Sequence, residues 1–224
     1  MFARRVYELL ASNTLTVSNF SRGVRTLFGN LVICSDSGNE IVARLSKILD
    51  QELGYKKHLL LGLRKVIFEH TYERRLNYIL EKSFKGSARL NASYLPEISV
   101  LAICPNENSL QHILEQFNNQ NYENRKLLVF SDVAEEKKFE NIIWKTIDDL
   151  KNKRISEITS SPFITFFSDQ DFYGENYLLD LGLATKYSSA TAIGKSSFFE
   201  KTTQITTNQL PRVFSFSTKT TFIL

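Results

Sequence analysis

The sequence from Phe163 to Asp171 reads FITFFSDQD, an apolar and aromatic run of strand length that ends on two carboxylates one residue apart. Gly174 and a helical pattern follow it. This order predicts a buried strand that delivers Asp169 and Asp171 to the edge of a sheet. Because ligands of open α/β sheets bind beyond the carboxyl ends of the strands, two carboxylates there suit Mg²⁺ or Mn²⁺ bound to the phosphates of a substrate. The alternative is a solvated turn in which both aspartates act as turn formers and helix caps.

The composition is that of a folded protein that can bury a core. Hydrophobic residues make up 42% and aromatic residues 12% of the 224 residues, which excludes a disordered or fibrous chain and allows one large α/β domain or two small ones. Cys34 and Cys104 each end an apolar run, which predicts core thiols rather than a disulfide or a metal site. No apolar run reaches the ~18 residues of a membrane span, and the N-terminus lacks the apolar region and cleavage site of a signal peptide. We therefore expect a cytoplasmic protein without a transmembrane segment.

The net charge of +4 is unevenly distributed along the chain. Residues 1–94 contain 15 Lys and Arg against 8 Asp and Glu, a net charge of +7, whereas residues 95–224 contain 13 against 16, a net charge of −3. A basic half can face nucleic acid, anionic lipid or phosphorylated small molecules. Its charges are spread along helical faces and no aromatic-basic nucleic-acid module is visible, so we expect no nucleic-acid partner.

The first part of the chain, residues 1–85, has the pattern of a doubly wound α/β lobe. We predict strands over residues 14–18 and 31–34 and helices over residues 1–13, 22–29, 40–52, 55–70 and 71–85. The first helix ends at Asn13, a residue that tolerates the left-handed conformation. Helices and strands alternate first, and further helices follow. This order favours an α/β lobe of which the chain contains only the later part.

The second part begins after a linker that we place at residues 86–97, which lacks periodicity and contains Pro96 near its end. We predict strands over residues 98–104 and 127–132, in addition to the strand that begins at Phe163, and helices over residues 109–119 and 139–150. Alternating strands and helices indicate a Rossmann-like half-domain. The predicted fold class is thus α/β, with two incomplete Rossmann-like units.

Residues 4–18 and 69–75 resemble the C-terminal part of the group 1 glycosyltransferases related to spore maturation proteins. That resemblance implies a partial GT-B donor-binding lobe over residues 1–85. It implies that Glu8 accepts hydrogen bonds from the ribose of a nucleotide-sugar and that Arg5 meets its diphosphate. The alternative for Glu8 is a surface acid paired with Arg4 or Arg5, and His70 is interpreted as a helix-boundary residue rather than a catalyst.

Residues 98–224 resemble the nucleotide-binding half of the family 2 glycosyltransferases, which have the GT-A fold. The matching stretches are residues 98–104, 116–124, the strand that ends at Asp132, 168–181 and 193–195. The resemblance implies that Asp169 and Asp171 hold a divalent ion on the donor's diphosphate and that Asp132 contacts the base or ribose. The alternatives are an ordinary strand-end acid for Asp132 and, for Lys195, either a phosphate contact or a solvated loop lysine.

The sequence also departs from the family 2 pattern. Residues 104–107 read CPNE where the family commonly has Thr-x-Asn, and no Asp or Glu follows Glu200, so the general base for an acceptor hydroxyl is unassigned and the domain is expected to be truncated. Our leading hypothesis is a metal-assisted glycosyltransferase that moves a sugar from a nucleotide-sugar to a polysaccharide or to a cell-surface or spore glycan. The alternatives are a non-catalytic remnant or interaction module whose sheets a companion polypeptide completes, and a nucleic-acid-binding protein, which rests on the basic half alone.

Overall fold

The computed structural model describes residues 4–84, 94–132, 140–151 and 153–195, and the backbone of residues 197–199, 205–207 and 221–223. The chain divides into two compact units, residues 1–92 and 93–224. Both contain parallel strands joined through helices, so the chain is an α/β protein, which confirms the α/β part of the predicted class. Among the described residues, no helix has the length and apolarity that crossing a membrane requires.

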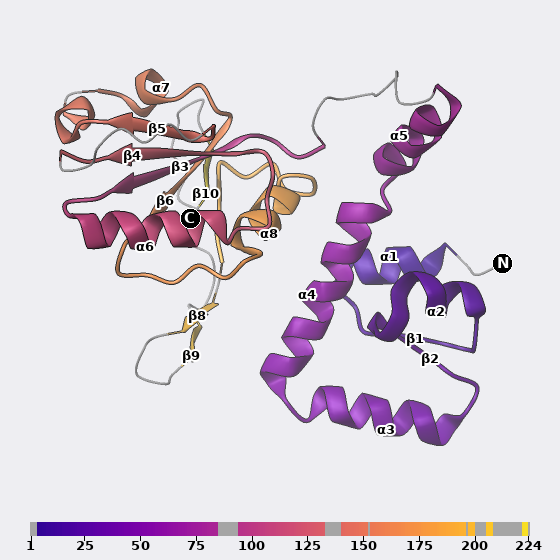
Figure 1. The fold of residues 1–224 in the computed structure, drawn as a ribbon. Coiled ribbons are helices and arrows are strands. Elements are labelled where there is room, and N and C mark those ends of the chain that lie inside the picture. Colours follow the sequence, from indigo (N-terminus) through magenta and orange to yellow (C-terminus); the bar gives the residue numbers. More distant parts are fainter. Residues whose placement is uncertain are drawn as a thin grey trace. The chain divides into compact units, whose positions relative to one another are not determined.

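The first unit contains a short parallel sheet with helices packed on it, and α5 lies beyond the end of α4, away from the sheet (Figure 1). Its elements are α1 (Arg5–Ala11), β1 (Thr16–Ser18), α2 (Arg22–Phe28), the 3₁₀ helix η1 (Gly29–Leu31), β2 (Val32–Cys34), α3 (Gly38–Leu49), α4 (Glu52–Glu69) and α5 (Tyr72–Ser83). Strands β1 and β2 pair in parallel, with Val17 opposite Ile33. The predicted order of elements is therefore observed over residues 4–84.

The core of the first unit is formed by apolar side chains of α1, α2 and α4 together with those of β2. It contains Val6, Leu10, Val24, Phe28, Val32, Cys34 and Val66. Helix α4 can approach α1 closely at Gly62, where a Cβ atom would lie 2.9 Å from Leu10 Cδ2. The Cys34 thiol is free and buried, as predicted, and its Sγ donates to the Asn19 carbonyl at 3.2 Å. Asn13 has a φ of 55°, so it adopts the left-handed conformation that the sequence predicted.

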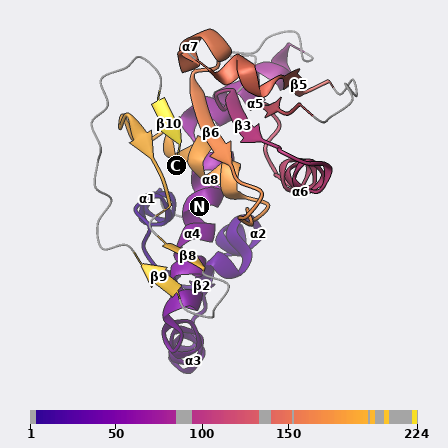
Figure 2. The ribbon, with the colours of Figure 1, turned by 90° about the vertical axis from the view of Figure 1, so that its left-hand side faces the viewer.

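The second unit is built on a six-stranded parallel sheet in the order β5-β4-β3-β6-β10-β7. Figure 2 shows β6 between β3 and β10. The elements are β3 (Ile98–Ile103), α6 (Glu107–Asn118), β4 (Arg125–Phe130), β5 (Ile142–Lys145), η2 (Ile147–Leu150), α7 (Ile155–Ile158), β6 (Phe163–Phe167), α8 (Tyr177–Ala184), β7 (Ala192–Ile193), the antiparallel pair β8 (Ser197–Phe199) and β9 (Ile205–Thr207), and β10 (Thr221–Ile223).

The helix predicted over residues 139–150 is wrong. Residues 142–145 form the edge strand β5, paired with β4, and residues 147–150 form the 3₁₀ helix η2. The apolar spacing resembled a helical stripe, but the segment Ile142-Ile143-Trp144 consists of β-branched and aromatic residues, which pack well on a sheet. As a consequence, β6 is the fourth strand of this unit and not the third.

The strand order creates a switch point between β3 and β6. From β3 the chain builds the sheet in one direction through β4 and β5, and it then returns to place β6 on the other side of β3. This order is compatible with a Rossmann-like fold, in which ligands bind beyond the carboxyl ends of the strands at such a point. The predicted acids follow one of these two strands.

The two faces of the sheet are covered by different helices. On one face a core cluster joins Leu101, Leu128, Phe130 and Ile164 of the strands to Ile158 of α7. Because successive side chains of a strand point to opposite faces, Thr165 and Phe167 lie on the other face, where Phe167 contacts Tyr177 of α8. The buried ring of Tyr122, in the segment after α6, packs against α8 at Gly182, where a Cβ atom would lie 2.6 Å from Tyr122 Cε2.

We predict that Gly182→Ala destabilises the second unit by about 1–2 kcal/mol. Alanine is the better helix former by up to ~1 kcal/mol, but forcing a methyl group against a buried ring costs ~1–3 kcal/mol. Urea unfolding followed by the fluorescence of Trp144, the single tryptophan of the chain, reports on this unit. Gly174→Ala is the control, because open space surrounds a Cβ atom at that position. A stabilised Gly182→Ala protein would contradict the close packing of Tyr122 on α8.

Candidate ligand site at the carboxyl ends of β3 and β6

The loop that connects β6 to α8, residues 168–176, carries the two predicted metal ligands. Asp169 and Asp171 follow directly after β6, at the switch point of the sheet. The Asp169 residue is partly buried, whereas Asp171 is exposed. The structure therefore brings both acids to the strand end at which the sequence placed them.

Two buried glutamines hold this loop, Gln116 of α6 and Gln120 directly after that helix. Gln116 Oε1 accepts a hydrogen bond from the Tyr173 backbone N–H at 2.9 Å. Gln120 Nε2 donates to the Gly174 carbonyl at 3.1 Å, and its Oε1 accepts from the Leu178 N–H at 3.1 Å. The two side chains are 7% and 3% exposed. Because buried backbone polar groups need partners, these contacts fix the path of the loop and the start of α8.

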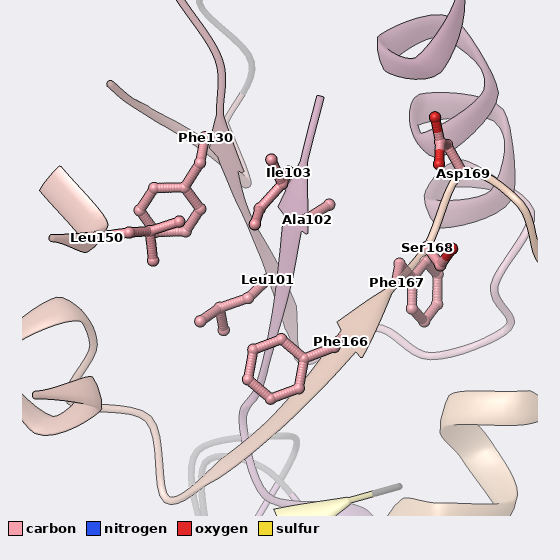
Figure 3. Close-up of a pocket in the computed structure, with 9 residues that line it drawn as sticks. All are labelled: Leu101, Ala102, Ile103, Phe130, Leu150, Phe166, Phe167, Ser168 and Asp169. Carbon is pink, nitrogen blue, oxygen red and sulfur yellow. The ribbon is translucent and has the colours of Figure 1, made fainter. Parts of the chain in front are cut away.

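Asp169 is held against the first turn of the same helix. Ser109 Oγ donates to Asp169 Oδ2, and Gln170 Nε2 donates to Oδ1 at 3.1 Å. Figure 3 shows the Asp169 carboxylate beside a helix and turned away from Leu101 and Leu150. The hydrogen bond from Ser109, followed by that from Gln170, holds the pKa of Asp169 below its usual value. Asp169 is consequently a carboxylate at neutral pH.

Asp171 is oriented by an aromatic side chain of its own loop. The Tyr173 hydroxyl donates to Asp171 Oδ2 at 3.4 Å and accepts from the Ser168 N–H at 3.0 Å. The Tyr173 ring stacks on Phe167, with 3.9 Å between ring centroids. Burial raises the pKa of Tyr173 to about 12, so its hydroxyl remains a donor. On the other side of the loop, His112 Nε2 lies 3.2 Å from the Asp171 carbonyl oxygen, to which it donates.

The carboxylate oxygens at this strand end are the kind of ligand that a hard divalent cation such as Mg²⁺ prefers, when water or a substrate supplies its remaining ligands. The described part of the chain contains no group of three or more His, Cys, Asp or Glu residues that could hold a metal ion by itself. Mg²⁺ in protein sites commonly has one or two carboxylates, with water and substrate phosphates completing its coordination. Each carboxylate oxygen of Asp169 that accepts one hydrogen bond retains a second lone pair. Asp169 and Asp171 are therefore the carboxylates of this strand end that could serve as oxygen ligands of a divalent cation.

The other predicted residues of the second unit contact neighbouring parts of the chain. Asp132 is exposed after β4, and its Oδ1 accepts from the Ile147 N–H at 3.0 Å, at the start of η2. Lys195 Nζ forms an ion pair with Asp180 of α8. Asp132 thus accepts a backbone N–H of its own unit, and Lys195 pairs with a carboxylate of the same unit. Cys104 is free and buried, and burial, with a smaller contribution from the Asp169 charge, raises the pKa of its thiol to about 11.

In the first unit, Glu8 and Arg5 lie on the exposed surface of α1. Glu8 Oε1 lies 2.7 Å from Arg4 Nε, which is the surface ion pair stated as the alternative for Glu8. His70 directly follows α4, as its interpretation as a boundary residue requires, and its ring packs edge-on against Tyr7 and Phe28. Burial lowers the pKa of His70, which favours the neutral ring.

Sequence reasoning did not identify the side chains of α6, and of the residues directly after it, that hold the loop. They are Ser109, His112, Gln116 and Gln120. Their positions recur at helical spacing beside the predicted apolar face, which was the available signal. Polar residues at helical spacing normally face water, so this pattern indicates an anchoring role only when the loop is known to pack against the helix.

A cavity of about 330 Å³ lies at the same end of the sheet, on the face that carries η2 and α7. Figure 3 shows the residues that line it, which are Leu101, Ala102, Ile103, Phe130, Leu150, Phe166, Phe167, Ser168 and Asp169. The site thus combines two carboxylates on an anchored loop with an adjacent apolar cavity.

Comparisons of the chain with protein-family models, with curated proteins and with solved structures found no match.

We predict that Gln120→Leu destabilises the second unit by about 1–3 kcal/mol, since it leaves buried backbone groups of the loop and of α8 without partners. Unfolding in urea, followed by Trp144 fluorescence, measures the decrease in the free energy of unfolding. Gln111→Leu is the matched control, because it makes the same change at an exposed position of α6. Equal effects of the two substitutions would refute the anchoring role of Gln120.

Ser109→Ala is predicted to raise the pKa of the Asp169 carboxyl, because it removes the hydrogen bond that contributes most to lowering it. The lowered pKa means that Asp169 contributes stability above its unfolded-state pKa, and that this stability is lost as the pH falls through the lower folded-state value. NMR titration of the carboxyl carbon measures the change. The Asp148 carboxyl provides an internal control in the same spectra, and a shift of both residues together would contradict the assignment.

Proposed function

We propose that the second unit binds a nucleotide-diphosphate sugar through a divalent cation held by Asp169 and Asp171, and that the chain acts in glycosyl transfer. The observation that carries this proposal is the position of the two carboxylates directly after β6, at the switch point between β3 and β6. Ligands of open parallel sheets bind at this position, and phosphate-bearing ligands there are commonly accompanied by Mg²⁺ or Mn²⁺.

The proposed reaction breaks the bond between the anomeric carbon of the sugar and the diphosphate oxygen, which keeps the bonding electron pair. A new bond forms to a hydroxyl oxygen of the acceptor, whose proton passes to a general base. A divalent cation would offset the negative charge that develops on the diphosphate. Asp169 and Asp171 would hold that cation, while Ser109 keeps the Asp169 carboxylate ionised and Tyr173 orients that of Asp171.

In finer detail, we propose that the second unit is the nucleotide-binding half of a GT-A-like domain and that the first unit is part of a GT-B-like donor lobe. Asp132 would contact the nucleotide of the donor, and in the first unit Glu8 and Arg5 would contact a ribose and a diphosphate. The exposure of these three side chains supports the proposal, because a ligand can reach them. A polysaccharide or a cell-surface or spore glycan is the proposed acceptor.

A second candidate function is a non-catalytic remnant or interaction module of such an enzyme. Two observations favour it. Within the described residues, the first unit has a sheet of only two strands, whereas parallel sheets are normally larger and covered on both faces. Helices α3 and α5 also contain no buried residues, although exposed apolar side chains such as Val42 and Ile79 lie on them. A companion polypeptide would cover both features.

Calorimetric titration of the full chain with a panel of nucleoside diphosphates and nucleotide-sugars, with and without Mn²⁺, tests donor binding. We expect Mn²⁺-dependent binding that Asp169→Asn and Asp171→Asn weaken at least tenfold, since each removes one anionic ligand of the cation. Asp148→Asn, on the exposed surface of η2, is the control. The absence of binding to every member of the panel would refute the donor site.

Assays of donor hydrolysis and of sugar transfer separate the two candidate functions. Mn²⁺-dependent turnover that Asp169→Asn abolishes would establish an enzyme. Binding without turnover by the isolated chain would instead favour the non-catalytic module.

A further inference from the structure

The cavity beside the site has an apolar end and a polar end. Phe130 and Leu150 lie at the apolar end, and Ser168 and Asp169 lie on the opposite side, where the Asp169 carboxylate is turned away from the apolar lining and toward Ser109 of α6 (Figure 3). Five further apolar residues complete the lining, so the polar groups are confined to the segment that follows β6. A ligand that fits this lining has an apolar part and a polar part.

The rim of the cavity exposes large apolar side chains at the ends of two neighbouring strands. Ile103 of β3 is 54% exposed and Phe166 of β6 is 48% exposed, whereas Leu101 and Phe130 beneath them are 3% and 0% exposed. Leu101 and Phe166 are direct partners in the parallel register, so their side chains share one face of the sheet. Leaving such side chains open to water forgoes hydrophobic stabilisation, which a bound apolar group would restore.

The size of the cavity favours a small molecule over a protein partner. Its volume of about 330 Å³ lies near the lower end of the ~300–1,000 Å³ range of small-molecule sites. A stable protein interface buries roughly 800 Å² on each partner, far more than two half-exposed side chains offer. The cavity can accept one ring or a short alkyl chain.

We propose that this cavity binds an apolar group of the glycan acceptor, an alkyl or aryl group carried on a sugar, with the sugar at the Ser168 and Asp169 end. The binding of an apolar group is inferred from the cavity alone. The role of the bound molecule as an acceptor depends on the proposed glycosyl transfer. The sugar would then lie beside the loop that carries the two carboxylates.

Octyl β-D-glucoside, kept below its micelle-forming concentration, is the probe, and methyl β-D-glucoside is the matched ligand without the apolar chain. We expect saturable changes in the ¹³C-methyl NMR signals of Leu101, Ile103 and Leu150 with the octyl compound, and binding at least tenfold weaker for the methyl compound. Ile103→Gln and Phe166→Gln should each weaken octyl glucoside binding at least tenfold. Both positions are half-exposed, and urea unfolding verifies that the variants remain folded.

Ile143→Gln is the control variant. Ile143 is 44% exposed on β5 of the same sheet, opposite Leu128 in the register, and it does not line the cavity. Loss of binding in this variant as well would show non-specific adsorption and overturn the proposal. It would also be overturned by the absence of saturable shifts, or by self-association of the chain that Ile103→Gln abolishes, which would identify a protein interface. Octyl glucoside binding by a chain that binds no nucleotide would refute the donor site and leave the cavity proposal standing.

Discussion

The pairing of Gln116 and Gln120 with the backbone of the segment after β6 is the constraint on which the candidate site depends. A loop of nine residues that leaves a buried strand carries backbone groups that must find partners. Gln116 of α6 bonds to Tyr173, and Gln120, directly after α6, bonds to Gly174 of the loop and to Leu178 of α8. Each contact spans more than fifty residues of sequence, so the loop keeps its shape only while α6 is packed on the sheet. The backbone of the loop that carries the acids is thereby positioned by the fold of the second unit.

The alternation of side chains along β6 divides the strand end into two environments. Phe166 points to the face that carries α7 and remains half-exposed at the cavity, whereas Phe167 points to the other face and stacks on Tyr173. That stacking positions the hydroxyl that contacts Asp171. A shift of one residue in register would exchange the two rings, which would remove both the support of the loop and the open rim of the cavity. The parallel pairing of Leu101 with Phe166 therefore fixes the polar and apolar halves of the site together.

The sequence predicted those features that are encoded locally. Strand β3 is a continuous apolar run, α1 has a helical stripe ended by Asn13, and the acids of residues 169–171 follow an aromatic run, so each was identified without knowledge of its neighbours. Strand β5 was missed because its four residues fit helical spacing as well as a strand, and only pairing with β4 decides between them. The anchoring glutamines could not be assigned either, because a polar helix position is exposed or buried according to what packs against it. The cavity depends in the same way on three strand ends and η2 meeting in space.

The intramolecular contacts of the predicted site residues differ in what they imply for ligand binding. The pair between Arg4 and Glu8 is exposed on both sides, and such pairs contribute ~0–1 kcal/mol, so a ligand can displace it at small cost. The contact of Ser109 with Asp169 is of another kind, since it stabilises the charged form of a partly buried carboxylate. A cation does not need to displace Ser109, because the carboxylate oxygen has a second lone pair. The hydrogen bond that gives Asp169 a structural role thus also keeps it ionised, and the two roles are compatible in one residue.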